Sequence, residues 1–103
     1  MRPLTEKMKK QIASDPFMKY CCITGDEGVS WEHCWTYGKG GQINEPWAIM
    51  PLRRDLNTSH PPKDVKDKCR LISLNRATPE DLAKYPKKNW LQIKSYLINK
   101  YEN

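Results

Sequence analysis

The chain has 103 residues, 38% of them hydrophobic, which is enough for one modest core, so we expect one domain over residues 1–103. Its 18 Lys and Arg residues against 12 Asp and Glu residues give a formal net charge of +6, which favours a polyanionic partner such as nucleic acid. No stretch approaches the roughly 20 apolar residues of a membrane span, and the charged N-terminus differs from a signal peptide. We therefore expect no membrane partner and a cytoplasmic location.

The first predicted element is a helix over residues 4–13. Met8 and Ile12 recur at helical spacing on one face, and Thr5 has the side chain to cap the N-terminus. Pro16 follows directly after Asp15, and this pair should end the helix.

A hairpin is predicted next. Residues 17–28 form a short apolar run closed by a turn-rich segment, which predicts a strand or an extended arm. Residues 29–35 have the β-branched and aromatic content of a strand, and residues 47–51 form a second short apolar strand. The stretch 38–46 between them is rich in glycine and is expected to be a loop.

Two helices are predicted directly after the hairpin. The first begins near Leu52 and covers residues 52–59, and Pro61 with Pro62 should interrupt it because neither can donate a helical hydrogen bond. The second covers residues 63–77, where apolar side chains share one stripe.

The C-terminal third is also predicted to be helical. Thr78 and Pro79, followed by two acidic residues, are typical of a helix start, and Pro86 should break this segment. A terminal helix then covers residues 88–101. Its expected buried face consists of Trp90, Ile93, Leu97 and Tyr101.

The four cysteines of the chain lack the two closely spaced pairs of a zinc ribbon. Disulfides are not expected without a secretory signal, so buried thiols are the favoured interpretation. The alternative is a small zinc-stabilised interaction module that uses Cys21, Cys22, Cys34 and a histidine.

Three residues around the predicted hairpin have the layout of a phosphodiesterase site. Phosphodiester hydrolysis needs a base for water and a cation that neutralises charge on the leaving oxygen. His33 is the candidate base, while Glu32 beside it and Asn57 on the predicted helix offer oxygen ligands for a cation. Each also has a structural interpretation: His33 as a histidine bonded to a backbone carbonyl, Glu32 as an exposed acid and Asn57 as a helix cap.

The order of these residues resembles the HNH family of nucleases, whose ββα-metal motif is a hairpin with a long loop followed by a helix. Glu32-His33 matches the pair at the end of the family's first strand, residues 48–52 match its second strand ending in Pro-Leu, and Asn57 matches its helix position. The glycine-rich loop at 38–41 is similar to loops in phage members. The matched segment covers about a quarter of the chain.

The resemblance implies an α+β fold in which a ββα-metal hairpin and helix are flanked by N- and C-terminal helices. It also implies a metal-dependent DNA endonuclease, encoded by a phage or prophage of a bacterial host. In that role His33 activates water, and Glu32 and Asn57 hold one divalent metal, either Mg²⁺ or Mn²⁺. Zn²⁺ or Ni²⁺ becomes an option if His60 joins the ligands, because residues three apart share a helix face.

The sequence departs from the family pattern at several positions. Glu32 stands where the family usually has Asp or His, and Ala48 stands where an asparagine would orient the catalytic histidine. Asn44 is the substitute that we expect to orient His33. The cysteine pairs that often brace such hairpins with zinc are absent, so packing, with Trp31 among the candidates, would have to hold this one.

Three basic residues are expected to contact nucleic-acid phosphates. Arg53 and Arg54 lie at the start of the predicted motif helix, and Lys39 lies in the glycine-rich loop. The lysines around residues 63–68 are expected to form a solvated face. The alternative function is a nucleic-acid-binding protein that keeps the fold and the basic surface but has little or no catalytic activity.

Overall fold

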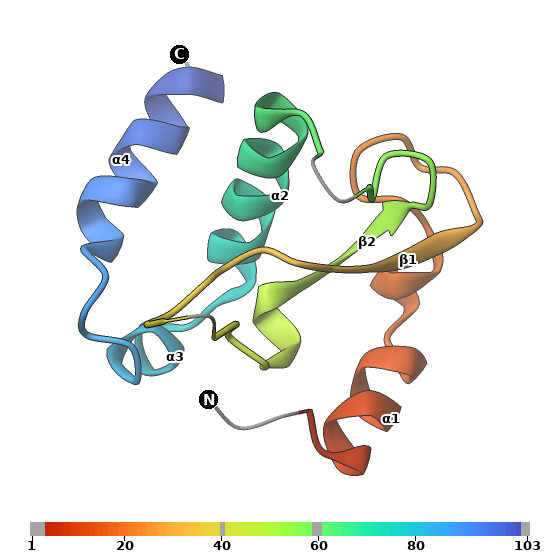
Figure 1. Ribbon diagram of the computed structural model, residues 1–103, viewed down its shortest axis with the longest axis horizontal. Coiled ribbons are helices and arrows are strands. Elements are labelled where there is room, and N and C mark those ends of the chain that lie inside the picture. The colour runs from red at the N-terminus through yellow and green to blue at the C-terminus, as the bar shows by residue number, and fades with distance from the viewer. Residues whose placement is uncertain (1–3, 40, 59–60, 102–103) are drawn as a thin grey trace.

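An antiparallel hairpin of two strands, β1 (Val29–His33) and β2 (Ile49–Arg53), lies between the N-terminal helix and the two long C-terminal helices (Figure 1). The structure is a computed structural model that describes residues 4–39, 41–58 and 61–101. It confirms the expected α+β class. Among the described residues, no helix has both the length and the apolar character that a membrane span requires.

The hairpin has a different packing partner on each face. β1 pairs with β2 from Val29 opposite Arg53 to His33 opposite Ile49, and successive side chains alternate between the two faces. Met50 and Leu52 belong to the main core beneath α2 (Lys63–Arg76). Ile49 belongs to a smaller core on the side of α1 (Glu6–Ser14). Neighbouring residues of β1 therefore face different surroundings.

The N-terminal segment starts as expected and then departs from the prediction. Thr5 caps α1 by accepting a hydrogen bond of 3.1 Å from the Met8 backbone N–H. The expected extended arm at 17–28 is wrong at its start, where Pro16–Lys19 form a 3-10 helix, η1. Asp15 explains the difference, because its carboxylate caps this turn through the Phe17 N–H while Pro16 supplies a helical φ.

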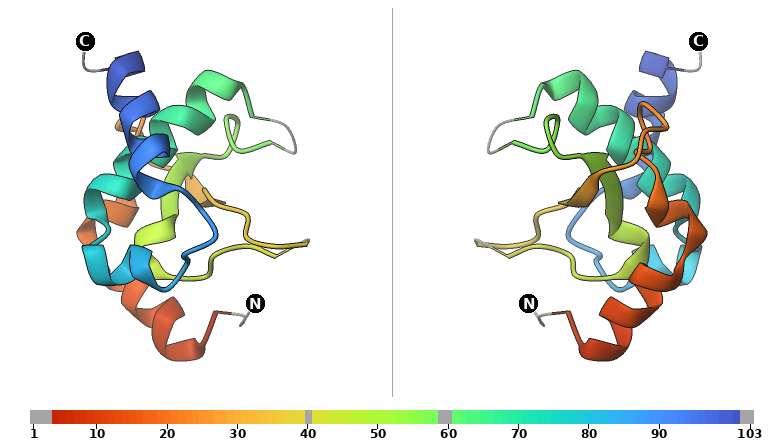
Figure 2. Two further views of the ribbon diagram at one scale, coloured as in Figure 1. Left: turned by 90° about the vertical axis from the view of Figure 1, so that its left-hand side faces the viewer. Right: turned by 90° about the vertical axis from the view of Figure 1, so that its right-hand side faces the viewer.

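The long connection between the strands forms two paired arms. Backbone hydrogen bonds join Tyr37 to Gly41 and Ile43 to Trp35 at 3.0 Å. Figure 2 shows these arms, in yellow, running side by side away from the hairpin. Before β2, the chain passes through a second 3-10 helix, η2 (Pro46–Ala48).

The helix predicted over residues 52–59 is wrong. Leu52 and Arg53 continue β2, where they pair with Ser30 and Val29, and the chain then turns at residues 54–56. Pairing with β1 is favoured over a helix because it places the Leu52 side chain in the main core. Local helix propensity does not include this long-range contribution. The first helix after the hairpin is α2, close to the bounds expected for 63–77.

The last two helices of the chain, α3 (Pro79–Ala83) and α4 (Trp90–Tyr101), follow the prediction closely. α3 begins with a capping box, in which the side chains of Thr78 and Asp81 each bond the backbone N–H of the other. α4 buries Leu97, and the other three residues of its expected apolar face are partly buried against the main core.

Ser73 of α2 joins both arms of the long connection to the helix. Its hydroxyl accepts a hydrogen bond of 3.0 Å from the Trp35 indole N–H and donates one of 2.7 Å to the Trp47 carbonyl. Both indole rings pack edge-on against Trp90, with centroids 5.1 and 6.0 Å away. Ser73 itself is fully buried.

Replacing Ser73 by Ala is expected to destabilise the fold by about 2 kcal/mol, because it leaves the buried indole N–H of Trp35 without an acceptor. Urea unfolding at neutral pH measures the change in free energy of unfolding. The matched control is Ser95→Ala on the exposed side of α4, which should change stability by less than about 0.5 kcal/mol. Equal effects of the two substitutions would contradict a structural role for the Ser73 hydroxyl.

Candidate functional site

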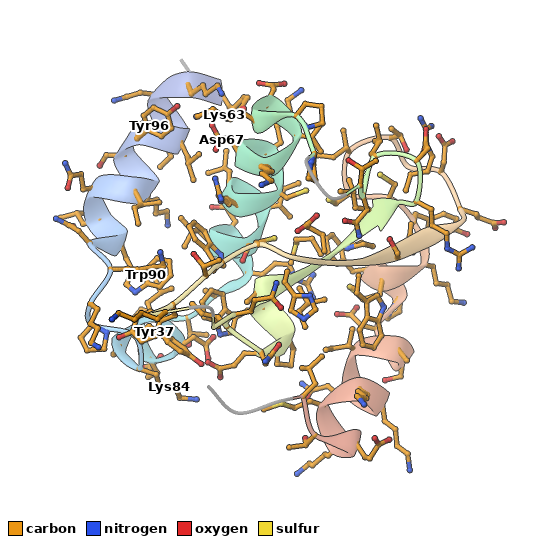
Figure 3. The ribbon with its side chains drawn as sticks, viewed as in Figure 1. Tyr37, Lys63, Asp67, Lys84, Trp90 and Tyr96 are labelled. Carbon is orange, nitrogen blue, oxygen red and sulfur yellow. The ribbon has the colours of Figure 1, made fainter. Side chains whose placement is uncertain are left out.

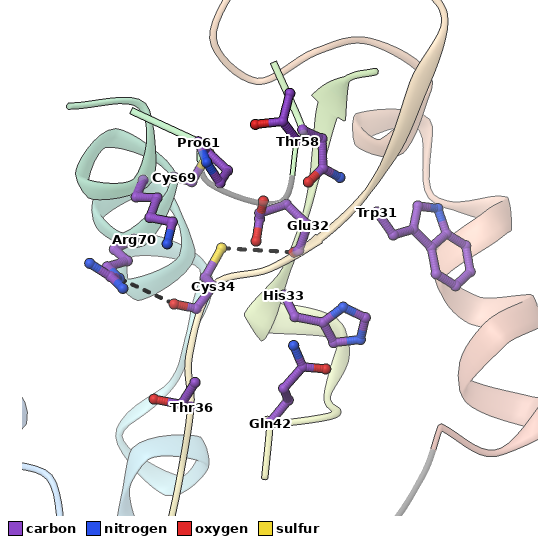
Figure 4. Close-up of a pocket in the computed structure, with 12 residues that line it drawn as sticks. Trp31, Glu32, His33, Cys34, Thr36, Gln42, Thr58, Pro61, Cys69 and Arg70 are labelled. Carbon is purple, nitrogen blue, oxygen red and sulfur yellow. Dashed lines mark hydrogen bonds between the residues drawn. The ribbon is translucent and has the colours of Figure 1, made fainter. Parts of the chain in front are cut away.

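A pocket of about 340 Å³ lies between the end of β1 and α2 (Figure 4). Three segments contribute most of its polar lining. They are Glu32, His33 and Cys34 at the end of β1, Asn57 and Thr58 after β2, and Lys66, Cys69 and Arg70 on α2. The pocket thus combines carboxylate, imidazole, amide and cationic groups.

Glu32 is half-buried on the face of the hairpin that meets α2. Figure 4 shows its side chain directed toward Cys69 of that helix. Burial raises the pKa of the Glu32 carboxyl, and the positive charges of Lys66 and Arg70 act in the opposite direction without cancelling it. The site therefore disfavours an isolated carboxylate charge and favours a cation beside it.

His33, the last residue of β1, points away from Glu32 toward the side of Trp31 (Figure 4). Burial lowers the pKa of its imidazole, while a side-chain hydrogen bond with Asn44 acts in the opposite direction. The neutral imidazole is the form that accepts a proton. The structure also brings Asn44 to His33, as the sequence analysis expected.

Asn57 reaches the pocket by a different route from the one expected. It lies in the loop after β2 and not on a helix, since the described residues 52–58 of the predicted helix form strand, turn and loop. Its Nδ2 donates a hydrogen bond of 2.7 Å to Ser30 Oγ, on the same strand face as Glu32. This bond uses the amide nitrogen, whereas a metal would bind the amide oxygen. The expected ligand His60 lies outside the described residues.

The three expected phosphate contacts lie outside the pocket lining. Arg53 is in β2, where its guanidinium binds Asp55 through Nε at 2.6 Å and Asp26 through Nη1 at 2.5 Å. Arg54 and Lys39 are exposed side chains within the described part of the chain. The Arg53 guanidinium is therefore already paired with two carboxylates. Arg53 also lies in a strand and not at the N-terminus of a helix, where it was expected.

Lys66 was expected on a solvated face and Arg70 had no expected role, but both line the pocket, and Lys66 is half-buried there. They stand four residues apart, so they lie on the same face of α2. Arg70 is fixed by a 3.2 Å hydrogen bond from its Nε to the Cys34 carbonyl, and its guanidinium lies 5.7 Å from the Trp35 ring centroid. The signal in the sequence was the (i, i+4) spacing of two cations beside Cys69.

Glu32 and Asn57 are the oxygen donors that would hold a divalent metal. Such donors suit Mg²⁺ or Mn²⁺, which keep several water ligands and use few protein ligands. Within residues 4–39, 41–58 and 61–101, no group of three or more His, Cys, Asp or Glu side chains gathers closely enough to hold a metal.

The cysteines match the interpretation as buried thiols. Cys69 and Cys22 have their sulfur atoms 3.7 Å apart, and this hydrogen bond raises the pKa of the Cys69 thiol. Burial raises the pKa of the Cys34 thiol. For the Cys21 thiol, burial opposes ionisation, but the hydrogen bonds with Thr24 outweigh it and lower the pKa, and the hydrogen bond with Cys69 lowers the pKa of Cys22. Two of the three cysteines of the zinc-module alternative therefore keep thiols suited to a metal.

Comparison of the chain with protein-family models, with curated proteins and with solved structures gave no match. The resemblance to the HNH family therefore stays a prediction that depends on the motif residues.

Asp67, one turn before Arg70, organises the cations of this region. Its almost fully buried carboxylate binds Lys63 at 2.6 Å, Lys100 of α4 at 3.0 Å and Arg70 at 3.2 Å. Burial favours protonation of Asp67, but the hydrogen bonds from Lys63 and Lys100 outweigh it and lower the pKa. A single carboxylate therefore connects α2 to α4.

The lowered pKa of Asp67 predicts a pH dependence of stability. Because the pKa is lower in the folded chain than in the unfolded chain, the stabilisation is fully present above about pH 4 and is lost as the pH falls through the folded pKa. Asp67→Asn should lose about 2 kcal/mol at pH 7. It should also flatten the fall in stability below about pH 4, as measured by urea unfolding at several pH values.

The control is Glu27→Gln, which removes an exposed carboxylate from the loop before β1 and should leave most of the acid dependence in place. An acid dependence of Asp67→Asn identical to that of the wild type would contradict the role of Asp67.

Proposed function

We propose that the chain is a metal-dependent DNA endonuclease of the HNH type. The observation that supports it best is the joint placement of Glu32 and His33 at the end of β1, beside a pocket that also contains Asn57 and two cations of α2. The expected pairing of Asn44 with His33 adds to this support. The strand, strand, helix order of β1, β2 and α2 is the order that a ββα-metal motif requires.

In the proposed reaction His33 takes a proton from a water molecule that attacks the phosphorus atom. Asn44 orients the imidazole for this transfer. The bond from phosphorus to the 3′ oxygen breaks, which leaves a 5′-phosphate and a 3′-hydroxyl group. Lys66 and Arg70 bind the non-bridging oxygens of the phosphate. Glu32 and Asn57 would hold Mg²⁺ or Mn²⁺, which when bound stabilises negative charge on the leaving oxygen.

The proposal includes DNA as the partner and the cytoplasm of a bacterial host cell as the location, with a phage or prophage as the source of the gene. The net charge of +6 supports a polyanionic partner. Arg53 was expected to bind phosphate, but two carboxylates already bind its guanidinium. Phosphate binding is therefore assigned to Lys66 and Arg70.

A nucleic-acid-binding protein without catalytic activity is the second candidate function. It is favoured by the charge that faces Glu32: α2 directs Lys66 and Arg70 at this carboxylate, and both act to lower its pKa without any metal. In this alternative the two cations and Glu32 form a binding surface, and no water is activated.

The first test is nicking of supercoiled plasmid DNA by the wild type and by His33→Ala, each with Mg²⁺, Mn²⁺ or EDTA. The wild type should produce open-circular DNA only with metal, and His33→Ala should be slower by about a thousandfold, because the base is missing. Binding of the same DNA in EDTA should be unchanged by the substitution.

Circular dichroism and urea unfolding of His33→Ala serve as the folding control. Absence of cleavage by the wild type with every metal, together with intact DNA binding, would reject the nuclease and favour the binding protein.

The second test compares two lysines of α2. Lys66 is half-buried in the pocket, whereas Lys68 is exposed and paired with Asp64 at 3.4 Å. Lys66→Ala should lower the nicking rate by about a hundredfold because charge on the phosphate is no longer neutralised. Lys68→Ala should keep at least about half of the rate, since surface pairs of this kind contribute little. Similar rates for the two variants would remove Lys66 from the mechanism.

A further inference from the structure

A second pocket, of about 490 Å³, lies between α2 and α4. It adjoins the first, because Thr36 and Arg70 belong to the linings of both. Figure 3 shows Lys63, Asp67 and Tyr96 together at one end of this region, where the two helices face each other. We call this second pocket the α2–α4 groove. The two pockets therefore lie side by side, with Thr36 and Arg70 between them.

The groove carries an excess of positive charge. Lys63, Arg70 and Lys88 line it, and Asp67 is the acidic residue among its described lining residues. The carboxylate of Asp67 is almost fully buried and is shared by three cations, counting Lys100, so the outer surface of the groove remains cationic. Such a surface attracts a polyanion.

The groove also presents an aromatic ring to solvent. Tyr96 is 51% exposed, and its hydroxyl accepts a hydrogen bond of 2.9 Å from Lys63, whose Nζ lies 5.1 Å from the ring centroid. The Trp35 ring is buried, with Arg70 and Lys88 over it at 5.7 and 5.8 Å. Lys63 thus lies directly beside the exposed Tyr96 ring, and Arg70 and Lys88 lie over the buried Trp35 ring of the same groove.

An exposed aromatic ring in a cationic groove matches one class of polyanion. Phosphates pair with Lys and Arg side chains, and an unpaired base stacks on the ring. Bases of a duplex are already stacked on each other, so they do not reach a ring in a groove without leaving the helix. The combination therefore favours a single strand over a duplex.

We propose that the α2–α4 groove binds a single-stranded segment of nucleic acid, with phosphates on Lys63, Arg70 and Lys88 and one base stacked on Tyr96. This inference rests on the proposed function, from which it takes DNA as the polymer. It adds that the DNA is unpaired on one side of the scissile phosphate. The substrate class is then DNA with a single-stranded region, such as a flap, a gap or an end.

The test is fluorescence anisotropy in EDTA with a labelled single-stranded oligonucleotide of about 16 nucleotides and with the corresponding duplex. The wild type should bind the single strand about tenfold more tightly than the duplex. Tyr96→Ala and Lys88→Glu should each weaken single-strand binding about tenfold. Tyr96→Phe, which keeps the ring and removes the hydroxyl, should bind nearly as the wild type does.

The matched controls lie at η1, on the α1 side of the hairpin. Tyr20 is 49% exposed, close to the value for Tyr96, and Lys19 is an exposed lysine beside it. Tyr20→Ala and Lys19→Glu should change the affinity by less than about twofold. Equal losses in groove and control variants, or tighter binding of the duplex, would overturn the inference.

Plasmid nicking, measured in parallel, separates this inference from the proposed function. Loss of single-strand binding in the groove variants, with no cleavage by the wild type under any metal, would uphold the groove and reject the nuclease. The opposite outcome has two parts: the wild type cleaves with metal, and Tyr96→Ala and Lys88→Glu bind the single strand as tightly as the wild type does. That outcome would uphold the nuclease and reject the groove.

Discussion

The hydrogen bonds of one buried serine fix the geometry on which the candidate site depends. Ser73 bonds the side chain of Trp35 and the backbone of Trp47, which lie on opposite arms of the connection between β1 and β2. Both arms are thereby held against α2. Glu32 and His33 directly precede the first arm, so Ser73 also determines how far they lie from the cations on the same helix. Together with the bond from Arg70 to the Cys34 carbonyl, the two hydrogen bonds of Ser73 thus hold the end of β1 against α2.

Much of the fold could be predicted because its signals are local. The caps at Thr5 and Thr78 and the apolar periodicity of α4 depend on residues within a few positions of each other, and the structure confirms all three. The segment from Leu52 onward was mispredicted because its conformation is decided by pairing with Ser30 and Val29, more than 20 residues away. Helix propensity carries no information about such a partner.

The residues of the candidate site also divide into those that the sequence predicted and those whose position depends on tertiary packing. Glu32 and His33 are adjacent, and Asn44 was expected near His33 only because the resemblance to the HNH family requires an asparagine that Ala48 does not supply; Asn44 does bond His33. Lys66 and Arg70 were not predicted, since their position depends on the way α2 crosses the hairpin. Arg53 was misassigned because its partner Asp26 lies in a turn 27 residues earlier in the chain.

The bonds that Asp67 makes to Lys63, Arg70 and Lys100 have a consequence for binding energetics. Long cationic side chains lose rotamer entropy when they are ordered, and each such loss opposes association if it happens at the moment of binding. Here the ordering of these three side chains takes place when the chain folds. The entropy cost therefore lowers the free energy of unfolding. An anion that binds does not have to order these three side chains, so this cost does not reduce its affinity.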